Sequence, residues 1–365
     1  MRIAYLCKRR YMSKDVVLDR YARVYEVPAK LAARGHQVEA WCLSYRKERE
    51  EGTWTHDAAP GTLTWHSEPA MPGLPTYPWR LLRALRKFKP DLIIAGTDIP
   101  HVALGAWLKG KLRVPLVVDL YDNFEGFGQA KIPGFVSLLR WATRKADLVL
   151  TTSEPLRELV VDTYRAKGIV VAMPSTIDRA VFHPRDRAAC RAALGLPQDA
   201  LLVGTAGGLN REKGIEALYA AWAILEKRMP NVHLVLAGPH GFPPPTGDRV
   251  HSLGPLPHER VAQVFGALDV GAICILDTEF GRYCFPQKAY EMLACDLPVV
   301  VGDVGAMHYL FADMPEFLYR AGSAEDLADK LETQLRNPRK ADVPIRDWSE
   351  VIASIEPTMR RLVSG

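Results

Sequence analysis

Short apolar runs that alternate with amphipathic segments restrict the fold of this chain more than any other feature. Residues 3–7, 38–43 and 116–120 are nearly uninterrupted apolar runs, and segments with helical periodicity, such as 19–34 and 101–112, lie between them. Strands that are apolar on both faces are typical of parallel sheets covered by helices on each side. The alternation therefore predicts an α/β fold with a parallel, doubly wound sheet.

The same alternation starts again near residue 200, which predicts a second sheet. A chain of 365 residues is long for a single core, and this also favours two domains. We expect an N-terminal domain over 1–180, a second domain over 181–345 and a final helix within 346–365. Residues 46–78 are polar and rich in Pro and Trp, so we expect little regular structure there. Further strands are expected at 91–96, 147–151, 169–171, 201–206, 232–238, 250–254, 270–274 and 299–301, and further helices at 135–145, 154–166, 215–228, 258–267, 286–297, 323–336 and 347–363.

Composition narrows the class of protein. The chain has 48% apolar and 24% charged residues, as globular proteins do, and it lacks the run of about 18 apolar residues that predicts a membrane span. The six cysteines show no C-x-x-C pair and no histidine spacing for zinc, so we expect reduced thiols, no metal and a cytoplasmic location. The start, MRIAYLCKRR, lacks the apolar core of a signal peptide. The net charge of +5 favours anionic partners mildly, and no nucleic-acid partner is expected.

Residues 280–305, FGRYCFPQKAYEMLACDLPVVVGDVG, combine a helix, a buried strand and a turn with glycine. Lys288 and Glu291 are three residues apart and share one face of the helix. The valine run 299–301 is a buried strand, and Gly305 follows it. Turns at the carboxyl ends of parallel strands are where open α/β sheets bind ligands, so this stretch is a candidate site.

A second candidate site is the loop 207–214, GGLNREKG, which lies between the apolar run 201–206 and a long helix. Glycines let the backbone approach a phosphate, a helix N-terminus attracts anions, and Lys213 supplies a positive charge. The alternative is a solvated strand-to-helix turn, because short glycine motifs often occur by chance.

In order and spacing, these stretches resemble the GT-B glycosyltransferases, family 4 in particular. The pattern Pro-x-Lys-x-x-Glu-x-x-Ala-x-x-x-Pro-Val-Val, which begins at Pro286, is similar to the donor-site helix and strand of that family. The loop 207–214 is similar to its Gly-Arg-Leu-x-x-x-Lys-Gly loop, and residues 174–184 are similar to its interdomain signature. The resemblance implies two doubly wound, Rossmann-like domains facing a central cleft, with the last helix crossing back to the first domain.

The resemblance also implies that the second domain binds a nucleotide-diphosphate sugar, such as a UDP-sugar or a GDP-sugar, without a cofactor or metal. Lys213 would bind the diphosphate, Glu291 would hold the ribose, and Lys288 would pair with Glu291 or reach a phosphate. The expected donor-binding residues are Gly207, Gly208, Arg211, Lys213, Glu279, Arg282, Tyr283, Lys288, Glu291, Gly305, Ala306 and Met307, with Leu253, Pro255 and Leu256 beside the nucleotide base.

Two positions depart from the family pattern. Gly208 stands where the family usually has a second phosphate-binding Arg, and Arg211 is the candidate that would compensate. Tyr283 stands where the family carries the first Glu of an E-x7-E pair near the donor sugar. Glu279 would replace that Glu only if the loop shifts; otherwise backbone N–H groups or Arg282 would meet the sugar.

The first domain is expected to hold the acceptor. Tyr121 and Asp122 follow the apolar run 116–120, where the family often has a His or Arg and then an Asp. A carboxylate at the carboxyl end of a strand would orient an acceptor hydroxyl or stabilise positive charge on the sugar, so both residues are candidate catalytic residues. The alternative is that Asp122 only caps the following turn. Acceptor selection is expected to depend on residues 8–20 and 46–80, while Asp119 and His101 are interpreted as structural residues.

Residues 79–89, WRLLRALRKFK, place basic residues around an apolar face. Such a helix would lie on an anionic membrane where a lipid-linked acceptor is presented. The alternative is a helix that packs its leucines on the sheet, as every doubly wound sheet requires. The loop Lys8-Arg9-Arg10 would add to the same basic surface or bind an anionic acceptor.

We therefore interpret the chain as a metal-independent glycosyltransferase of the hexosyltransferase type. It would move a sugar to a hydroxyl of a glycan, lipid-linked or small-molecule acceptor in bacterial-type polysaccharide, glycolipid or glycoconjugate synthesis, and the resemblance implies retention of configuration. One alternative is a non-catalytic GT-B protein that binds nucleotide-sugar or acts as a partner subunit, which Gly208 and Tyr283 keep open. Another is a different enzyme on the same fold, such as an epimerase.

Overall fold

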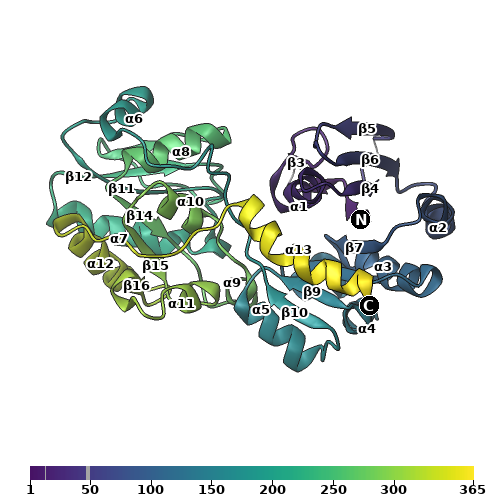
Figure 1. Ribbon diagram of the computed structural model, residues 1–365. Helices are drawn as coiled ribbons and strands as arrows, with labels where there is room; N and C mark the ends of the chain where they lie inside the picture. The colour runs from purple at the N-terminus through teal and green to yellow at the C-terminus, as the bar shows by residue number, and fades with distance from the viewer. Residues whose placement is uncertain (13, 47–49) are drawn as a thin grey trace. The chain divides into compact units, whose positions relative to one another are not determined.

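The computed structural model describes residues 1–12, 14–46 and 50–365, and the chain divides into two compact units. Unit 1 comprises residues 1–175 and 348–365, and unit 2 comprises residues 176–347. In each unit, helices cover a mainly parallel sheet (Figure 1). The α/β, doubly wound fold class expected from the sequence is confirmed. The observed boundaries lie within a few residues of the expected ones at 180 and 345.

Unit 1 is built on an eight-stranded sheet with the strand order β10-β9-β8-β7-β1-β4-β6-β5. Strand β1 is central, with Tyr5 opposite Ala40 of β4 on one side and Ile94 of β7 on the other. All neighbours pair in parallel except β5 and β6. The strands are β1 (Arg2–Lys8), β4 (Gln37–Ser44), β5 (Gly52–His56), β6 (Thr62–Pro69), β7 (Leu92–Gly96), β8 (Leu116–Leu120), β9 (Leu148–Thr151) and β10 (Ile169–Ala172), beside a separate short pair, β2 (Arg10–Tyr11) and β3 (Lys14–Asp15).

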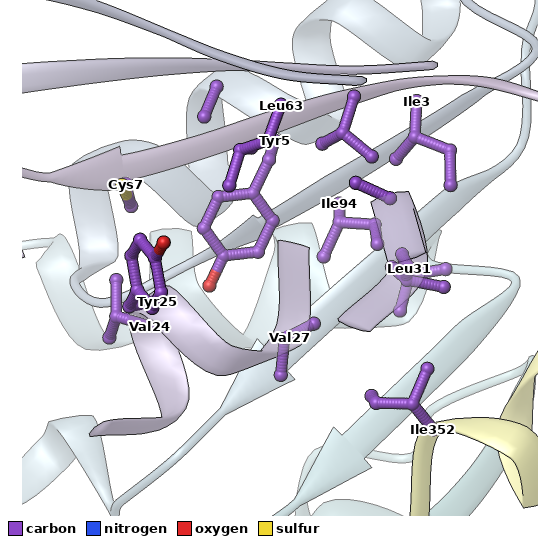
Figure 2. Close-up of a cluster of buried hydrophobic side chains, with 14 of the residues drawn as sticks. Ile3, Tyr5, Cys7, Val24, Tyr25, Val27, Leu31, Leu63, Ile94 and Ile352 are labelled. Atoms are coloured by element: carbon purple, nitrogen blue, oxygen red, sulfur yellow. The ribbon is translucent and has the colours of Figure 1, made fainter. Parts of the chain in front are cut away.

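The core of unit 1 lies where helix α1 packs against the centre of this sheet. Val24, Val27 and Leu31 recur at helical spacing and lie on the side of Tyr5 (Figure 2). Ile352 of the last helix joins the same cluster, so the end of the chain belongs to this core. Full burial of one such side chain contributes about 1.5–3 kcal/mol. The helices of unit 1 are α1 (Ala22–Ala33), α2 (Tyr77–Phe88), α3 (Ile99–Leu112), α4 (Phe135–Lys145), α5 (Glu154–Glu158) and α13 (Trp348–Ser364).

Unit 2 has a six-stranded, wholly parallel sheet with the order β13-β12-β11-β14-β15-β16. Its strands are buried on both faces, since Val299 and Val301 belong to one apolar cluster and Val300 to another. Helices α7 and α12 cover the Val300 face, and α6, α8 and α10 cover the opposite face. The elements are α6 (Arg187–Leu194), β11 (Leu201–Ala206), α7 (Ile215–Arg228), β12 (Val232–Ala237), β13 (Val250–Ser252), α8 (His258–Ala267), β14 (Val270–Ile273), α9 (Glu279–Tyr283), α10 (Lys288–Ala294), β15 (Val299–Gly302), α11 (Ala306–Leu310), β16 (Leu318–Tyr319) and α12 (Ala324–Arg336).

The expectation of little regular structure over residues 46–78 was wrong. Strands β5 and β6 lie within this range, and β6 extends the parallel sheet beside β4. Leu63, Trp65 and Ser67 of β6 are buried while the residues between them are not, which is the period-two pattern of a strand. Part of the range, residues 47–49, lies outside the described residues. Elements α6, α9, α11 and β16 were not anticipated either, because each is short.

Each sheet has one switch point, where the chain changes the side on which it adds strands. In unit 1, β4 pairs with one side of β1 and β7 with the other. In unit 2, β12 pairs with one side of β11 and β14 with the other. Doubly wound sheets bind ligands at the carboxyl ends of the strands that flank a switch point. A ligand site is therefore expected at the loops after β1 and β7 in unit 1, and at the loops after β11 and β14 in unit 2.

Candidate functional site

The loop after β11 is held in a fixed shape by the loop after β12. The N–H of Gly207 donates to the carbonyl of Ala237 at 2.9 Å, and the N–H of Leu209 donates to the carbonyl of Pro239 at 3.0 Å. Gly207 has a φ of +108°, which glycine adopts readily. A β-carbon on Gly238 would lie 2.0 Å from the carbonyl oxygen of Gly207, so the two backbones meet closely. The sequence thus builds a rigid, side-chain-free corner at the end of the strand.

Two lysine ammonium groups converge on this corner. The Nζ of Lys288, from the start of α10, lies 3.6 Å from the position that a β-carbon of Gly207 would take, and the Nζ of Lys213 lies 3.2 Å from that of Gly208. Burial lowers the pKa of Lys288, and the charge of Lys213 lowers it further. We call Gly207, Gly208, Lys213 and Lys288 the lysine corner. Two like charges beside bare backbone are suited to an anion with several oxygens.

Arg211 has other partners. Its guanidinium lies 4.4 Å from the ring centre of Phe242, and its Nε lies 3.3 Å from the carboxylate of Glu216. The structure therefore brings Lys213 and Lys288 together but engages Arg211 outside the lysine corner.

Glu291 is buried at the next turn of α10 from Lys288 and faces a histidine. The Nε2 of His258 lies 3.5 Å from Oε1 of Glu291, and the imidazole packs edge-on against the ring of Phe182 at 4.8 Å between centroids. The hydrogen bond to Glu291 raises the pKa of His258, although partial burial opposes this. The sequence reasoning missed His258. Its signal was a histidine in the first turn of a helix that follows the segment 253–256.

The residues expected beside the nucleotide base lie close to this pair. The carbonyl of Gly254 accepts the N–H of Gly238, which ties the 253–256 segment to the end of β12. Leu253 and Leu256 are half-buried against the apolar cluster that contains Phe182, whereas Pro255 is exposed.

The residues expected beside the sugar form a second contact region in unit 2. A β-carbon on Gly305 would lie 2.6 Å from the carbonyl oxygen of Gly281 and 2.5 Å from that of Arg282, so the turn before α11 packs directly on α9. The guanidinium of Arg282 pairs with Asp277 at 2.5 Å. Beyond the glycine turn, Ala306 and Met307 are buried in the core. Of the other two expected residues, Glu279 is exposed and Tyr283 is half-buried.

In unit 1, Tyr121 and Asp122 lie at the carboxyl end of β8 beside the end of β1. The Nζ of Lys8 donates to the hydroxyl of Tyr121 at 3.1 Å, and that hydroxyl lies 3.1 Å from the carbonyl oxygen of Thr97. Asp122 accepts the N–H of Asn123 at 2.8 Å, but the side chain that caps the following turn is that of Asn123, whose Oδ1 accepts the N–H of Glu125 at 3.1 Å. Burial raises the pKa of Asp122 to about 6, against the opposing effects of that hydrogen bond and of Lys8.

The end of β7 adds two residues that the sequence reasoning set aside or missed. Asp98 accepts the N–H of His101 at 2.9 Å and pairs with its Nδ1 at 2.5 Å, and the hydroxyl of Tyr45 donates to the other oxygen at 3.1 Å. Burial alone would raise the pKa of Asp98, but His101 and the charge of Lys8 lower it. Thr97, which precedes it, has a φ of +78°, a strained value for a β-branched residue. We call Lys8, Asp98, His101, Tyr121 and Asp122 the Lys8 cluster.

The other basic residues near the end of β1 are engaged in structural pairs. The guanidinium of Arg9 is buried against Asp15 at 3.0 Å, and Arg10 pairs with Glu50. Arg23 is fully buried against both oxygens of Asp119: its Nε lies 2.9 Å from Oδ1 and 3.1 Å from Oδ2, and its Nη2 lies 2.6 Å from Oδ1. Asp119 is therefore part of the core, and the basic loop presents Lys8 rather than three cations.

Neither a membrane span nor a metal cluster is found among the residues that the structure describes. In that part of the chain, no helix has both the length and the apolar character needed to cross a bilayer. The same residues contain no group of three His, Cys, Asp or Glu side chains placed to bind a metal ion.

Comparison with known proteins identifies the class that this fold and these loops define. Residues 22–175 match the family described as glycosyl transferase 4-like domain, and residues 200–337 match glycosyl transferases group 1. Sucrose-phosphate synthase from Thermosynechococcus elongatus superposes with a TM-score of 0.73 at 20% identity, covering 100% of this chain and 99% of the other. HepE from Anabaena, solved in complex with UDP, superposes with a TM-score of 0.70 at 20% identity over 100% of both chains. The chain belongs to the group 1, family 4-like glycosyltransferases of the GT-B fold, as its motifs indicated.

Curated relatives are more similar in sequence but align over less of their length. The D-inositol 3-phosphate glycosyltransferase of Stackebrandtia nassauensis is 32% identical over 220 residues, which are 54% of this chain and 48% of that relative. The chain thus spans about half the length of this curated relative.

Proposed function

We propose that this protein transfers a sugar, with retention of configuration, from a nucleotide-diphosphate donor to an acceptor hydroxyl. Unit 2 would bind the donor and unit 1 the acceptor. The family resemblance supports retention, and the HepE complex supports UDP as the first nucleotide to test.

The observation that carries the proposal is the lysine corner. A diphosphate needs several donors and positive charge, and this corner offers bare backbone with the ammonium group of Lys288 beside Gly207 and that of Lys213 beside Gly208. Hydrogen bonds to charged groups contribute about 1.5–3 kcal/mol each. Lys288 would thereby supply the second cation. In the family, an Arg at the position of Gly208 usually supplies it. The same cations would offset the charge of the leaving diphosphate, so no metal is required for that step.

The neighbours of the lysine corner would contact the rest of the donor. Glu291 would accept hydrogen bonds from the ribose hydroxyls, and His258 would keep its carboxylate in place. The base would lie along Leu253, Pro255 and Leu256. The sugar would then face the turn at Gly305 and helix α9, where Glu279, Arg282 and backbone N–H groups are the candidate partners. In unit 1, Asp122 would orient the acceptor hydroxyl.

The test is a thermal-unfolding screen with UDP, GDP, ADP and their sugars. A ligand at about 100 times its dissociation constant adds roughly 2.7 kcal/mol to stability. We expect one nucleotide to raise the unfolding temperature, and we expect Lys213→Ala, Lys288→Ala and Glu291→Ala each to reduce the rise. Lys227→Ala is the matched control, because Lys227 is an exposed lysine on α7 of the same unit.

The outcomes separate the proposed activity from its alternative. Transfer to an acceptor, with the product anomer read by NMR, would establish the reaction and its stereochemistry. Nucleotide binding without transfer or donor hydrolysis would favour a non-catalytic GT-B protein. If no nucleotide shifts the unfolding temperature, the donor assignment is wrong.

We further propose that helix α2 contacts anionic membrane at the cytoplasmic face. Residues 69–90 carry five basic residues and no acidic one, so the net charge of this segment equals the net charge of +5 of the whole chain. Leu81, Leu82 and Leu85 are buried, so the helix does pack on unit 1, but Trp79 is 64% exposed beside the basic face. Each basic residue near an anionic surface contributes about 1 kcal/mol.

Arg83→Glu combined with Arg86→Glu should abolish sedimentation with phosphatidylglycerol vesicles, and equal binding to pure phosphatidylcholine would contradict the proposal.

A further inference from the structure

The Lys8 cluster has the position of a ligand site. Lys8 ends β1, Asp98 follows β7, and Tyr121 and Asp122 follow β8, so the cluster lies across the switch point of the unit 1 sheet. Its shape is fixed by hydrogen bonds from Lys8 to Tyr121 and from Tyr45 and His101 to Asp98. Such rigid polar groups at a strand edge are the usual setting of a binding site.

One polar atom of the cluster lacks a partner. His101 is only 1% exposed, and its Nδ1 is occupied by Asp98, but its Nε2 has no hydrogen-bond partner among the described residues. A buried polar atom without a partner is unfavourable by about 1–3 kcal/mol. A hydroxyl can satisfy an imidazole nitrogen in either tautomer, since it both donates and accepts.

The charges of the cluster do not suit an anion. Burial lowers the pKa of Lys8, and the charges of Asp98 and Asp122 oppose that effect. The neighbouring cations Arg9, Arg10 and Arg23 are engaged by Asp15, Glu50 and Asp119. A phosphate at the cluster would therefore meet one ammonium group and two carboxyl groups. A ring of hydroxyls would find donors and acceptors in turn.

Aromatic rings flank these polar groups. Tyr11 packs edge-on against Tyr121 at 4.8 Å between centroids, and Phe124 packs against the same ring at 5.1 Å. The Nζ of Lys8 lies 5.9 Å from the ring centre of Phe127. An apolar wall with a few fixed polar groups fits a ligand that has both C–H faces and hydroxyls.

We infer that the Lys8 cluster is the acceptor site and that it takes an uncharged polyhydroxylated ring, a sugar or a cyclitol, in preference to its phosphate. This inference rests on the proposed function for the placing of the acceptor in unit 1. It differs from what the name of the D-inositol 3-phosphate relatives states for those proteins, whose acceptor carries a phosphate.

The test is saturation-transfer NMR on the full chain with paired probes. The uncharged probes are myo-inositol and the methyl α-glycosides of glucose, galactose and mannose, and the charged probes are myo-inositol 1-phosphate and glucose 6-phosphate. UDP is present throughout to fill the lysine corner. We expect transfer to the uncharged probes and at least tenfold weaker binding of the phosphates. Lys8→Met should weaken the uncharged probes at least fivefold, whereas Asp162→Asn, at an exposed carboxylate of the same unit, should not.

A double variant gives the inference a gain-of-binding outcome. Asp98→Asn with Asp122→Asn removes both carboxylates and leaves Lys8 in place, and Asn still serves as a helix cap at position 98. We expect this variant to bind the phosphates at least tenfold more tightly than the wild type. Retained UDP binding shows that the variant is folded.

Three results would overturn the inference: tighter binding of the phosphates than of their uncharged parents, no binding of any uncharged probe, or insensitivity to Lys8→Met. Failure of UDP to bind the wild type would count against the donor assignment instead. In that case the same probes are applied to the Lys213→Met, Lys288→Met chain, in which the lysine corner is removed.

Discussion

At the switch point of unit 2 the strand ends present two glycines and two lysines, whereas at the switch point of unit 1 they present two carboxylates, a tyrosine, a histidine and one lysine. The sheets follow the same winding rule, so the difference does not come from topology. It comes from the few residues that follow β11 and β14 in one unit, and β1, β7 and β8 in the other. One edge is suited to a phosphate and the other to hydroxyls. A reaction that joins a nucleotide-sugar to an alcohol requires both.

The largest expected effect is a loss of stability in unit 1, where Arg23 and Asp119 form a buried ion pair. Asp119→Ala would leave the fully buried Arg23 without its carboxylate, and breaking a buried pair in this way is unfavourable by about 3–5 kcal/mol. Urea denaturation should show this loss, while UDP affinity, which we assign to unit 2, should be retained in the folded protein. The control is Asp162→Ala at the surface, for which we expect a change below about 0.5 kcal/mol. A loss of less than 1 kcal/mol for Asp119→Ala would contradict the structural role of the pair.

The next prediction concerns the close backbone contact behind the lysine corner. Gly238→Ala would place a β-carbon 2.0 Å from the carbonyl of Gly207, so the loop must move and UDP binding should weaken strongly. We expect a stability loss of about 1–3 kcal/mol from overpacking, in addition to backbone strain. Gly254→Ala separates the two effects, because Gly254 also has a positive φ, +64°, but has open space around it. That variant should lose about 1–2 kcal/mol and leave the corner intact. Equal effects of the two variants on UDP affinity would contradict the role of the contact.

The pH dependence should distinguish the two edges. Burial raises the pKa of Asp122 to about 6, above the ordinary value of about 3.9, so the folded state binds this proton more tightly than the unfolded state. The contribution of Asp122 to stability therefore falls as pH rises from about 4 to about 6, while the carboxylate that we propose to orient the acceptor becomes ionised. We expect kcat/KM for the acceptor to rise through pH 6 in the wild type and to be flat over that range in Asp122→Asn. The affinity for UDP should show no such change through pH 6.

The smallest effect involves two glycines of one helix in unit 1. A β-carbon on Gly110 of α3 would have no atom within 4 Å, and Gly110→Ala should stabilise unit 1 by about 0.5–1 kcal/mol through helix propensity. On the same helix, a β-carbon on Gly105 would lie 2.6 Å from that of Ala95, so Gly105→Ala should destabilise. Thermal unfolding of both variants measures the difference, and a shift in the same direction for both would contradict the packing of α3 on β7.

Sequence periodicity predicted most of the parallel strands because both faces of each strand are apolar. It failed for β5 and β6, where Trp54, Trp65 and the polar residues around them give an alternating pattern that prolines on either side obscured. The five-residue helices α9 and α11 are too short to leave a periodic signal.

The two sites differed in how well sequence could predict them. The residues of the lysine corner could be predicted because Lys213 and Lys288 each lie in a recognisable motif. Their approach to the same pair of glycines depends on β11 and β14 being neighbours, which only the sheet order gives. For the Lys8 cluster, the sequence indicated Lys8, Tyr121 and Asp122 as separate candidates, but Asp98 was missed and His101 was interpreted as structural. Lys8, Asp98 and Asp122 are far apart along the chain, and His101 has no local feature that distinguishes it from a structural histidine. His258 was missed for the same reason, because its partner Glu291 is 33 residues away.

The most direct measurement compares the binding of UDP and of uridine by titration calorimetry, in the wild type, in Lys288→Met and in the surface control Lys227→Met. Because Lys288 lies at the corner assigned to the diphosphate, its loss should weaken UDP about 10- to 100-fold, which corresponds to the loss of one charge-assisted hydrogen bond. Uridine, which has no phosphate, should bind Lys288→Met and the wild type equally, and Lys227→Met should resemble the wild type with both ligands. An unchanged UDP affinity in Lys288→Met, or an equal weakening of UDP and uridine, would contradict the assignment of the lysine corner as the diphosphate site.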